Sequence, residues 1–290
     1  STVRPGDNLY TSSVLALYPT TGEIKWYYQF SPNDPFDYDS MNEMILAEFD
    51  GQKVLIHADK NGFLYVIDRT NGKLVAANKF VDDVNWADSI DLETGRPVHT
   101  AIYTDAVAGK EVEVWPGAFG AKNYAPTSYD PDKNVLYVNA LNIGMGYKPV
   151  PVKYRPGVQY LGCELTWAWP EDKVNGETRA INPMTGEVLW SNPSDVPRWG
   201  GIVSTDGGLV FTGAQTGEFQ ALDADTGALL WEFQTGSGVI GQPVTWELDG
   251  RQYVTVPNGG GAAYVLYMGD TRLANVPAGA GVWTFALPEN

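Results

Sequence analysis

An eleven-residue unit occurs four times in this chain and constrains its fold more than any other feature of the sequence. Each copy has an apolar dipeptide, a turn that ends in Gly, and alternating apolar residues that reach a Trp in three of the copies. The copies align without gaps and are Ala16–Trp26, Val66–Ala76, Ala180–Trp190 and Ala221–Trp231. A strand, tight turn and strand of this kind cannot bury its own apolar face, so it must stack beside a neighbouring copy. The repeat therefore predicts a β-propeller.

Two of the copies extend backwards into longer hairpins, which supports an all-β fold. The predicted strand pairs are Val54–His57 with Phe63–Asp68 and Leu209–Thr212 with Phe219–Asp223. Their connections end in Gly62 and Gly217, as tight hairpin turns require. Lys60 is thereby placed at a turn and not within a strand. Further strands are predicted around residues 129–132, with Val135–Val138 behind them, and at Pro243–Trp246 and Tyr253–Val256, whereas helical periodicity is nowhere sustained.

The interval between the second and third copies contains an insertion. Residues 81–178 exceed one blade of about 40 to 50 residues. Within them, residues 143–176 are rich in Gly, Pro and aromatic side chains and are interpreted as an excursion from a blade rim. The sequence predicts four to five blades, fewer than a closed ring of such blades normally needs. Residues 1–290 are therefore predicted to form a single partial propeller.

The composition excludes some classes of partner. The formal charge of −16 and the pI near 4.4 oppose binding to nucleic acid, and no basic stripe gathers the 19 Lys and Arg residues. No apolar stretch is long enough to span a membrane. The first residues lack the apolar core of a signal peptide, although a removed signal is left open. Cys163 is the only cysteine, and with His57 and His99 it is assigned no functional role.

A short acidic stretch is the first candidate site. Asp34, Asp37, Asp39 and Glu43 follow the first Trp-bearing strand. Asp37 and Asp39 are separated by one residue, so an extended backbone would point both carboxylates to one side, where they could bind one hard cation. The alternative is an acidic loop whose side chains cap turns or are solvated. Spacing alone leaves both interpretations open.

Three further residues, Lys60, Asn123 and Trp199, draw attention because of where they lie. Taken singly, they are a surface lysine, a turn residue and a packing residue. Each is predicted at the entry to a strand or at a turn between strands. In a propeller, such turns from every blade converge at one end of the central channel. A shared site for these side chains follows from that convergence.

With these motifs in view, the chain resembles the C-terminal half of the pyrroloquinoline quinone (PQQ)-dependent alcohol dehydrogenases, the quinoprotein methanol and ethanol dehydrogenases. The resemblance runs nearly end to end, through residues 4–8, 22–26, 32–43, 60–62, 68–69, 120–123, 199–201, 236–245 and 283–285. It implies an eight-bladed propeller whose blades are locked by tryptophan docking motifs. Trp26, Trp190 and Trp231 match those motifs.

The same resemblance implies roles for five side chains. Asp37 takes the place of the catalytic aspartate, which accepts the proton of the substrate hydroxyl and also binds the metal. Lys60 matches the basic residue that hydrogen-bonds the quinone oxygens, while Asn123 and Trp199 match residues that line the cofactor. Asp39 is similar to the additional metal ligand of the lanthanide-dependent members. A lanthanide ion is therefore expected, with Ca²⁺ as the alternative.

The resemblance also implies partners. About half of the family propeller is missing, including other metal ligands and both faces of the cofactor site, and Phe36 stands where many relatives have Trp. We expect a complementary N-terminal half-propeller chain or a homodimer, a primary alcohol as substrate, cytochrome c as electron acceptor and a periplasmic location. The alternative function is a non-catalytic propeller scaffold or binding module. A scaffold would need none of the five site residues.

Overall fold

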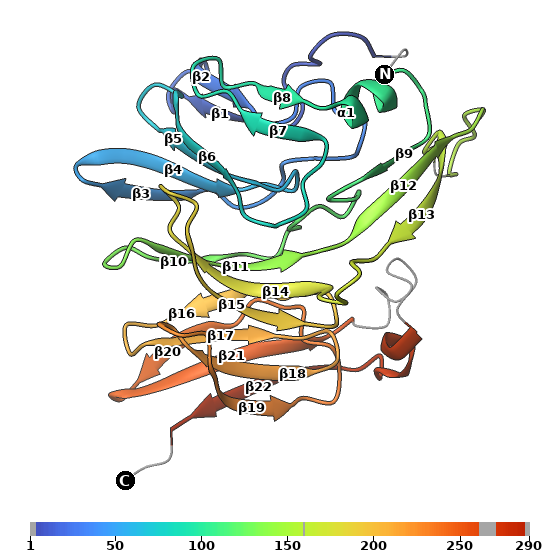
Figure 1. The fold of residues 1–290 in the computed structure, drawn as a ribbon. Coiled ribbons are helices and arrows are strands. Elements are labelled where there is room, and N and C mark those ends of the chain that lie inside the picture. The colour runs from blue at the N-terminus through green and yellow to red at the C-terminus, as the bar shows by residue number, and fades with distance from the viewer. Residues whose placement is uncertain (1–3, 159, 261–270, 288–290) are drawn as a thin grey trace. The chain divides into compact units, whose positions relative to one another are not determined.

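The protein is almost entirely β-structured, as the sequence predicts (Figure 1). The computed structural model describes residues 4–158, 160–260 and 271–287. The chain divides into two compact units, one of residues 1–123 and 142–171, the other of residues 124–141 and 172–290. Each unit is described by itself below. That both belong to one continuous partial propeller stays a prediction.

Among the residues that the structure describes, the first unit contains several small antiparallel sheets and one α-helix. Its four-stranded sheet has the order β3-β4-β5-β6, and the smaller sheets are β1-β2, β7-β8 and β13-β12-β9. The elements are β1 (Ser13–Leu17), β2 (Ile24–Gln29), β3 (Ile45–Phe49), β4 (Gln52–Ala58), β5 (Phe63–Asp68), β6 (Leu74–Lys79), β7 (Ala87–Ile90), β8 (Pro97–His99), α1 (Ala101–Val107), β9 (Val112–Val114), β12 (Gly144–Pro149) and β13 (Cys163–Ala168).

In its described residues, the second unit contains two four-stranded sheets and one three-stranded sheet, all antiparallel. Their orders are β10-β11-β14-β15, β16-β17-β18-β19 and β20-β21-β22. The elements are β10 (Ser128–Asp130), β11 (Val135–Leu141), β14 (Gly176–Ile181), β15 (Val188–Ser194), β16 (Ile202–Ser204), β17 (Leu209–Gly213), β18 (Glu218–Asp223), β19 (Leu229–Gln234), β20 (Val244–Leu248), β21 (Arg251–Gly259), the 3₁₀-helix η1 (Thr271–Asn275) and β22 (Ala280–Ala286).

All four sequence repeats fold into the same hairpin, β1–β2, β5–β6, β14–β15 and β18–β19. In each, the first residue of the repeat faces its last, and the strand register shifts directly after that first residue. The facing pairs are Ala16 with Trp26, Val66 with Ala76, Ala180 with Trp190 and Ala221 with Trp231. Such a bulge bends the strand and increases its twist. The repeat prediction is confirmed at the level of residue pairs.

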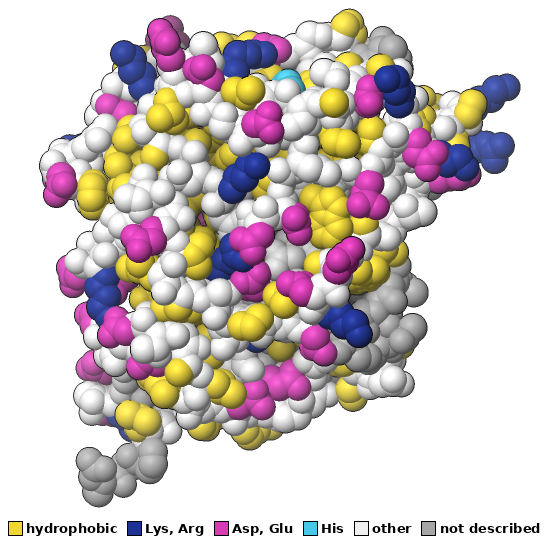
Figure 2. All heavy atoms as spheres, viewed as in Figure 1, with side chains coloured by type: hydrophobic (Ala, Val, Ile, Leu, Met, Phe, Trp, Pro, Cys, Tyr) yellow, Lys and Arg dark blue, Asp and Glu magenta, His cyan; other side chains and the backbone are white. Residues whose placement is uncertain are grey.

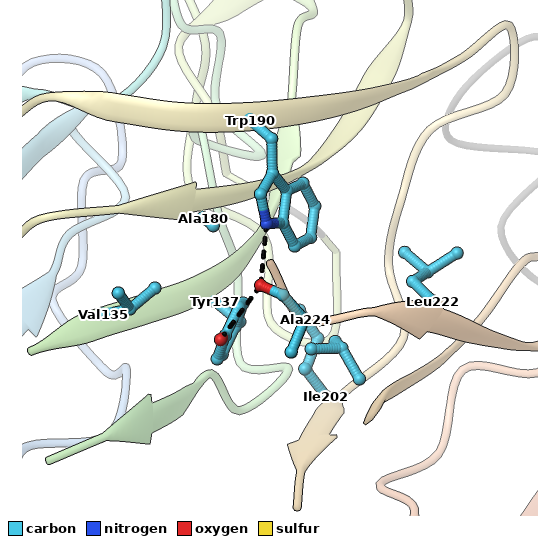
Figure 3. Close-up of a cluster of buried hydrophobic side chains, with 8 residues drawn as sticks. Val135, Tyr137, Ala180, Trp190, Ile202, Leu222 and Ala224 are labelled. Carbon is cyan, nitrogen blue, oxygen red and sulfur yellow. Dashed lines mark hydrogen bonds between the residues drawn. The ribbon is translucent and has the colours of Figure 1, made fainter. Parts of the chain in front are cut away.

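Tryptophans of one hairpin dock on the turn of the next. The Trp190 indole nitrogen donates a hydrogen bond of 2.9 Å to the Ala224 carbonyl (Figure 3). A Cβ at Gly227 would lie 2.5 Å from the Trp190 ring, and Gly227 has a φ of +71°. In the first unit Trp26 has the same relation to Gly72, where the separation would be 2.7 Å. The repeated Gly is therefore required both by backbone conformation and by contact with an indole.

One hydrophobic core cluster of the second unit lies around this contact. Tyr137 donates its hydroxyl proton to the carbonyl of Ala224, so that carbonyl accepts from two aromatic side chains (Figure 3). The buried side chains that surround it are Val135, Ala180, Ile202, Val210 and Leu222. Residues from two neighbouring sheets, β10-β11-β14-β15 and β16-β17-β18-β19, thus bury one apolar face against the other, as stacked repeats must.

The segment predicted as an excursion lies between two paired strands, and its status as an insertion from a blade rim stays a prediction. Strands β11 and β14 are neighbours in one sheet, so the chain leaves that sheet between them. The departing segment forms the hairpin β12–β13, and β12 also pairs with β9 in the first unit. Helix α1 is a difference from the sequence analysis, because seven residues make fewer than two turns and cannot show helical periodicity. In the described parts of the chain, no helix has the length and apolarity needed to cross a membrane.

Candidate active site

Three of the predicted site residues come together in the first unit. The ammonium group of Lys60 lies 3.5 Å from Asp37 Oδ2 and donates a hydrogen bond to Asp39 Oδ1. Only 4% of the Lys60 side chain is exposed, whereas the Asp37 and Asp39 side chains are 73% and 56% exposed. The ammonium group of a buried lysine side chain thus contacts two solvent-exposed carboxylates. The chemical roles of the three residues stay predictions.

The backbone route to this arrangement differs from the predicted extended strand. Asp37 has a φ of +72°, so the loop turns sharply at that residue. The carboxylate of Asp34 accepts hydrogen bonds from the backbone N–H groups of Phe36 and Tyr38, which fixes the turn. The extended-strand argument was therefore wrong at Asp37. A capped turn, and not the strand period, brings Asp37 and Asp39 to the same ammonium group.

Asp34 is a structural member of the acidic stretch. Burial raises its pKa to about 7, while the N–H groups of Phe36 and Tyr38 oppose the rise. The nearby negative charge of Asp37 raises the pKa further, and Lys60 lowers it. For this one residue, the turn-capping alternative of the sequence analysis gives the better description.

The Asp37 carboxyl has a raised pKa although its side chain is exposed. Surrounding protein atoms shield it in part from water, which is the main cause of the rise. The Lys60 ammonium group acts in the opposite direction, and the charge of Asp39 adds to the rise. A carboxylate with a raised pKa is a stronger proton acceptor, provided that a neighbouring cation keeps it ionised. This is the balance that a general base needs.

Lys60 is held from behind by the loop that contains Asn123. The Lys60 carbonyl accepts a hydrogen bond of 2.9 Å from Ala121 N–H, and its side-chain stem packs against Gly120. Asn123 is half-buried, and its amide donates to the Phe119 carbonyl at 3.0 Å. The sequence interpretation of Lys60, taken singly, as a surface lysine was wrong. The turn position was right, but the packing of a distant loop buries the side chain.

A second buried lysine, which the sequence analysis did not single out, lies beside this loop. Lys122 Nζ forms an ion pair of 2.7 Å with Glu43 and also donates to the Asn123 carbonyl at 3.1 Å. Burial lowers the Lys122 pKa, and the charges of Glu43 and Asp59 oppose this. Glu43 of the acidic stretch therefore forms an ion pair with a lysine from a distant loop. The only feature of the sequence that could have drawn attention to Lys122 was its position next to the predicted site residue Asn123.

Trp199, the fifth predicted residue, belongs to the second unit. Its side chain is 3% exposed and packs edge-on against Tyr124, with ring centroids 6.1 Å apart. The buried indole is consistent with a packing role inside that unit. Its predicted place beside the cofactor stays a prediction.

The carboxylates fit a metal as a partial ligand set. Asp37 and Asp39 offer hard oxygen donors near one point. Both carboxylates already contact a cation there, the ammonium group of Lys60. Within the described ranges, no group of three or more His, Cys, Asp or Glu side chains could hold a metal ion. Hard cations such as Ca²⁺ take six to eight oxygen ligands. Further ligands would have to come from outside these residues.

The stacked hairpins with docked tryptophans, together with the Asp-Lys loop, define a β-propeller protein of the quinoprotein type. The chain belongs to the glucose/ethanol/alcohol dehydrogenase β-propeller family, whose sequence profile matches residues 1–79 and 163–254. The predicted fold class and family are thereby confirmed.

Similar proteins support the same family. The chain is 43% identical to a quinoprotein ethanol dehydrogenase of Pseudomonas putida, over 97% of this chain and 47% of that protein. It is also 43% identical to quinoprotein alcohol dehydrogenase PedH of P. putida strain KT2440, over all of this chain and 50% of that protein. A solved europium-containing methanol dehydrogenase matches with a TM-score of 0.87 and 33% identity, over 97% of this chain and 54% of the other. The chain therefore spans about half the length of these relatives.

Proposed function

We propose that the chain is one part of a PQQ-dependent alcohol dehydrogenase that oxidises a primary alcohol to an aldehyde. The observation that carries the proposal is the convergence of Asp37 and Asp39 on the buried ammonium group of Lys60. Family membership and the relatives named above supply the reaction class. A non-catalytic scaffold would not need a buried lysine aimed at two exposed carboxylates.

The proposed roles follow from the charges of these side chains. Asp37 accepts the proton of the substrate hydroxyl and, with Asp39, binds the metal. Lys60 stabilises negative charge that develops on oxygen atoms near its ammonium group. PQQ would accept the hydride, and the metal would act as a Lewis acid. Asn123 and Trp199 are proposed to line the cofactor.

The metal is proposed to be a lanthanide, with Ca²⁺ as the alternative. Asp39 adds a second carboxylate two residues after Asp37, and a trivalent ion gains more from an added negative charge than a divalent ion does. The europium in the structurally similar methanol dehydrogenase supports this choice. Full activity further requires the remaining metal ligands, which we propose come from a complementary half-propeller.

The first hairpin offers a seat for that complementary segment. In three repeats, the hairpin forms the third and fourth strands of a four-stranded sheet, whereas β1–β2 is a two-stranded sheet among the described residues. Leu17 of β1 is consequently 52% exposed, while the equivalent Ile67, Ile181 and Leu222 are fully buried. Such an open strand edge favours pairing with another strand. Cytochrome c as electron acceptor and a periplasmic location are parts of the same proposal.

Reconstitution tests the function. The chain is co-expressed with the N-terminal half of the P. putida quinoprotein ethanol dehydrogenase, loaded with PQQ and either La³⁺ or Ca²⁺, and assayed with a primary alcohol and an artificial electron acceptor. Turnover is expected, and Asp39→Ala should abolish the response to La³⁺. The matched control, Asp88→Ala, removes an exposed carboxylate from β7 and should leave that response unchanged.

Two outcomes of this experiment count against specific parts of the proposal. An unchanged metal preference in Asp39→Ala overturns the lanthanide assignment. A properly assembled complex that neither turns over alcohol nor changes the absorbance of added PQQ overturns the enzymatic function and favours the scaffold.

A further inference from the structure

A fully buried histidine and aspartate lie directly behind the candidate site. His57 ends strand β4 together with Ala58, and Asp59 follows it in the turn that leads to Lys60. The His57 Nε2 and Asp59 Oδ2 atoms are 2.9 Å apart, and neither side chain is exposed to solvent. Burying two such polar groups is costly unless both are hydrogen-bonded. Their location next to Lys60 therefore calls for a structural reason.

Each member of this pair reaches a different element of the site. His57 Nδ1 lies 3.1 Å from the carbonyl oxygen of Glu43, at the end of the acidic loop. Asp59 Oδ1 accepts a hydrogen bond of 2.9 Å from the Asn61 N–H, in the turn of Lys60. Beside this connection, the Asn42 amide donates to the Ala58 carbonyl at 2.8 Å. The pair thus links the loop of the aspartates to the turn of the lysine.

Hydrogen-bonding rules determine which ring nitrogen of His57 must carry a hydrogen. A carbonyl oxygen can only accept, so His57 Nδ1 carries a hydrogen that it donates to Glu43. The contact between His57 Nε2 and Asp59 Oδ2 then needs a proton of its own, held on one of these two atoms. Without it, a lone pair would face a carboxylate oxygen in a site closed to water. The link between loop and turn therefore depends on both residues.

The surroundings allow the pair little freedom to move. The His57 ring packs against Phe30 with centroids 4.5 Å apart. The Asn61 side chain donates to the Tyr65 hydroxyl at 2.9 Å and to Ser31 Oγ at 3.1 Å. Beyond the pair, the buried Lys122 ammonium group is attracted to Asp59. Hydrogen bonds and ring packing of this kind favour one geometry of the buried pair.

We propose that His57 and Asp59 form a positioning pair. The pair fixes the position of the Lys60 turn relative to the loop that carries Asp37 and Asp39. Neither residue of the pair acts on substrate; they act through Lys60. The importance of this relative position for turnover rests on the proposed function. The position of Lys60 itself can be measured without cofactor or substrate.

The accessibility of Lys60 measures its position. The whole chain is treated with an amine-acylating reagent, and the labelling rate of each lysine is read by mass spectrometry. Lys60 should react slowly in the wild type, because its side chain is 4% exposed. Asp59→Ala should raise its rate about tenfold, because local opening becomes easier. Lys110, which is 65% exposed and remote in sequence, is the internal reference and should react at the same rate in both proteins.

A conservative variant separates positioning from loss of charge. In Asp59→Asn, the amide oxygen can still accept from Asn61, and the amide nitrogen can donate to His57 Nε2 when the ring carries its hydrogen on Nδ1. Lys60 should then be labelled at close to the wild-type rate. His57→Gln is a milder change, which removes the rigid ring that reaches the Glu43 carbonyl. It should increase the labelling rate of Lys60. It serves as the second variant if Asp59→Ala does not fold.

A destabilised control excludes a general loss of structure. Asn139 is a buried polar residue of the second unit, bonded to Thr212 and Gly200. Asn139→Ala should lower the thermal midpoint without faster Lys60 labelling. The proposal is overturned if folded Asp59→Ala or His57→Gln labels at the wild-type rate, or if Asn139→Ala accelerates Lys60 equally. An inactive reconstituted enzyme with the expected labelling pattern would instead overturn only the proposed function.

Discussion

The side chain of Lys60 occupies the space where a side chain at Gly120 would stand. A Cβ at position 120 would lie 2.0 Å from Lys60 Cγ and 2.6 Å from the Lys60 carbonyl oxygen. Gly120 also has a φ of +76°, a conformation that favours glycine. The loop of Asn123 and the turn of Lys60 can therefore approach each other only because residue 120 lacks a side chain.

Gly120→Ala is accordingly expected to lower the free energy of unfolding by about 2 to 5 kcal/mol, the sum of backbone strain and overpacking. Gly109→Ala is the matched control, because Gly109 has a φ of +78° but nothing within 4 Å of a Cβ. It should cost only the backbone strain of about 1 to 2 kcal/mol. Urea unfolding measures both. Equal losses would show that the contact with Lys60 carries no energy.

Equivalent tryptophans that differ in burial should differ in their contribution to stability. Trp190 is 8% exposed and hydrogen-bonds Ala224 in the next hairpin, so Trp190→Ala should cost about 3 to 5 kcal/mol. Trp231 occupies the equivalent position but is 38% exposed, and Trp231→Ala should cost clearly less. Chemical denaturation of both variants checks the difference. A larger loss at position 231 would contradict the docking argument.

The repeats could be predicted to the residue because their information is local. Turn Gly residues, apolar alternation and terminal Trp lie within eleven positions, so the strand, turn and strand of each copy follow from the pattern itself, whereas the bulge was seen only in the structure. The use of Gly227 beneath an indole of another repeat was visible only as a recurring Gly. Helix α1 was missed because a short helix carries too little periodicity.

The sequence singled out Asp37, Asp39 and Lys60, which the structure brings together, but it did not predict their geometry. The burial of Lys60 depends on a loop about sixty positions away, which no local pattern reports. The left-handed turn at Asp37 depends on a side-chain cap by Asp34, whereas the spacing of the aspartates suggested a strand. Lys122 and Glu43 are 79 positions apart, and nothing in either segment indicates their pairing.

The raised pKa of Asp34 predicts a pH-dependent contribution to stability. Its pKa is about 7 in the folded protein and near 3.8 ordinarily, so between these values the folded state binds more protons than the unfolded state. Stability from this group therefore falls as pH rises through that window. The cost of Asp34→Ala should consequently be larger at pH 5 than at pH 8.

Urea unfolding of the wild type and Asp34→Ala at both pH values measures this difference. Asp91→Ala serves as control, because the Asp91 carboxyl is exposed and hydrogen bonds from Thr94 lower its pKa. Its cost should be the same at pH 5 and pH 8. If the loss of unfolding free energy caused by Asp34→Ala did not change with pH, this result would contradict a raised pKa of Asp34 in the folded protein.

The open edge of β1 predicts where the proposed complementary half-propeller would bind. In the other three repeats, the strand equivalent to β1 pairs with an apolar strand, and the residues facing Ile67, Ile181 and Leu222 are Leu55, Leu136 and Val210. An incoming strand should likewise place an apolar residue opposite the exposed leucine of β1. A charge at that position would then be buried without a partner, which is strongly unfavourable.

Leu17→Asp should therefore weaken association with the N-terminal half of the P. putida ethanol dehydrogenase at least about tenfold, which corresponds to about 1.4 kcal/mol. It should barely change the stability of the chain by itself, because Leu17 is already 52% exposed. Leu92→Asp, at a side chain 55% exposed in the turn between β7 and β8, is the matched control and should bind normally. Titration calorimetry with the purified half gives the affinities. Equal weakening by both variants would indicate an effect of charge alone, and undiminished binding of Leu17→Asp would show that the complementary strands pair elsewhere.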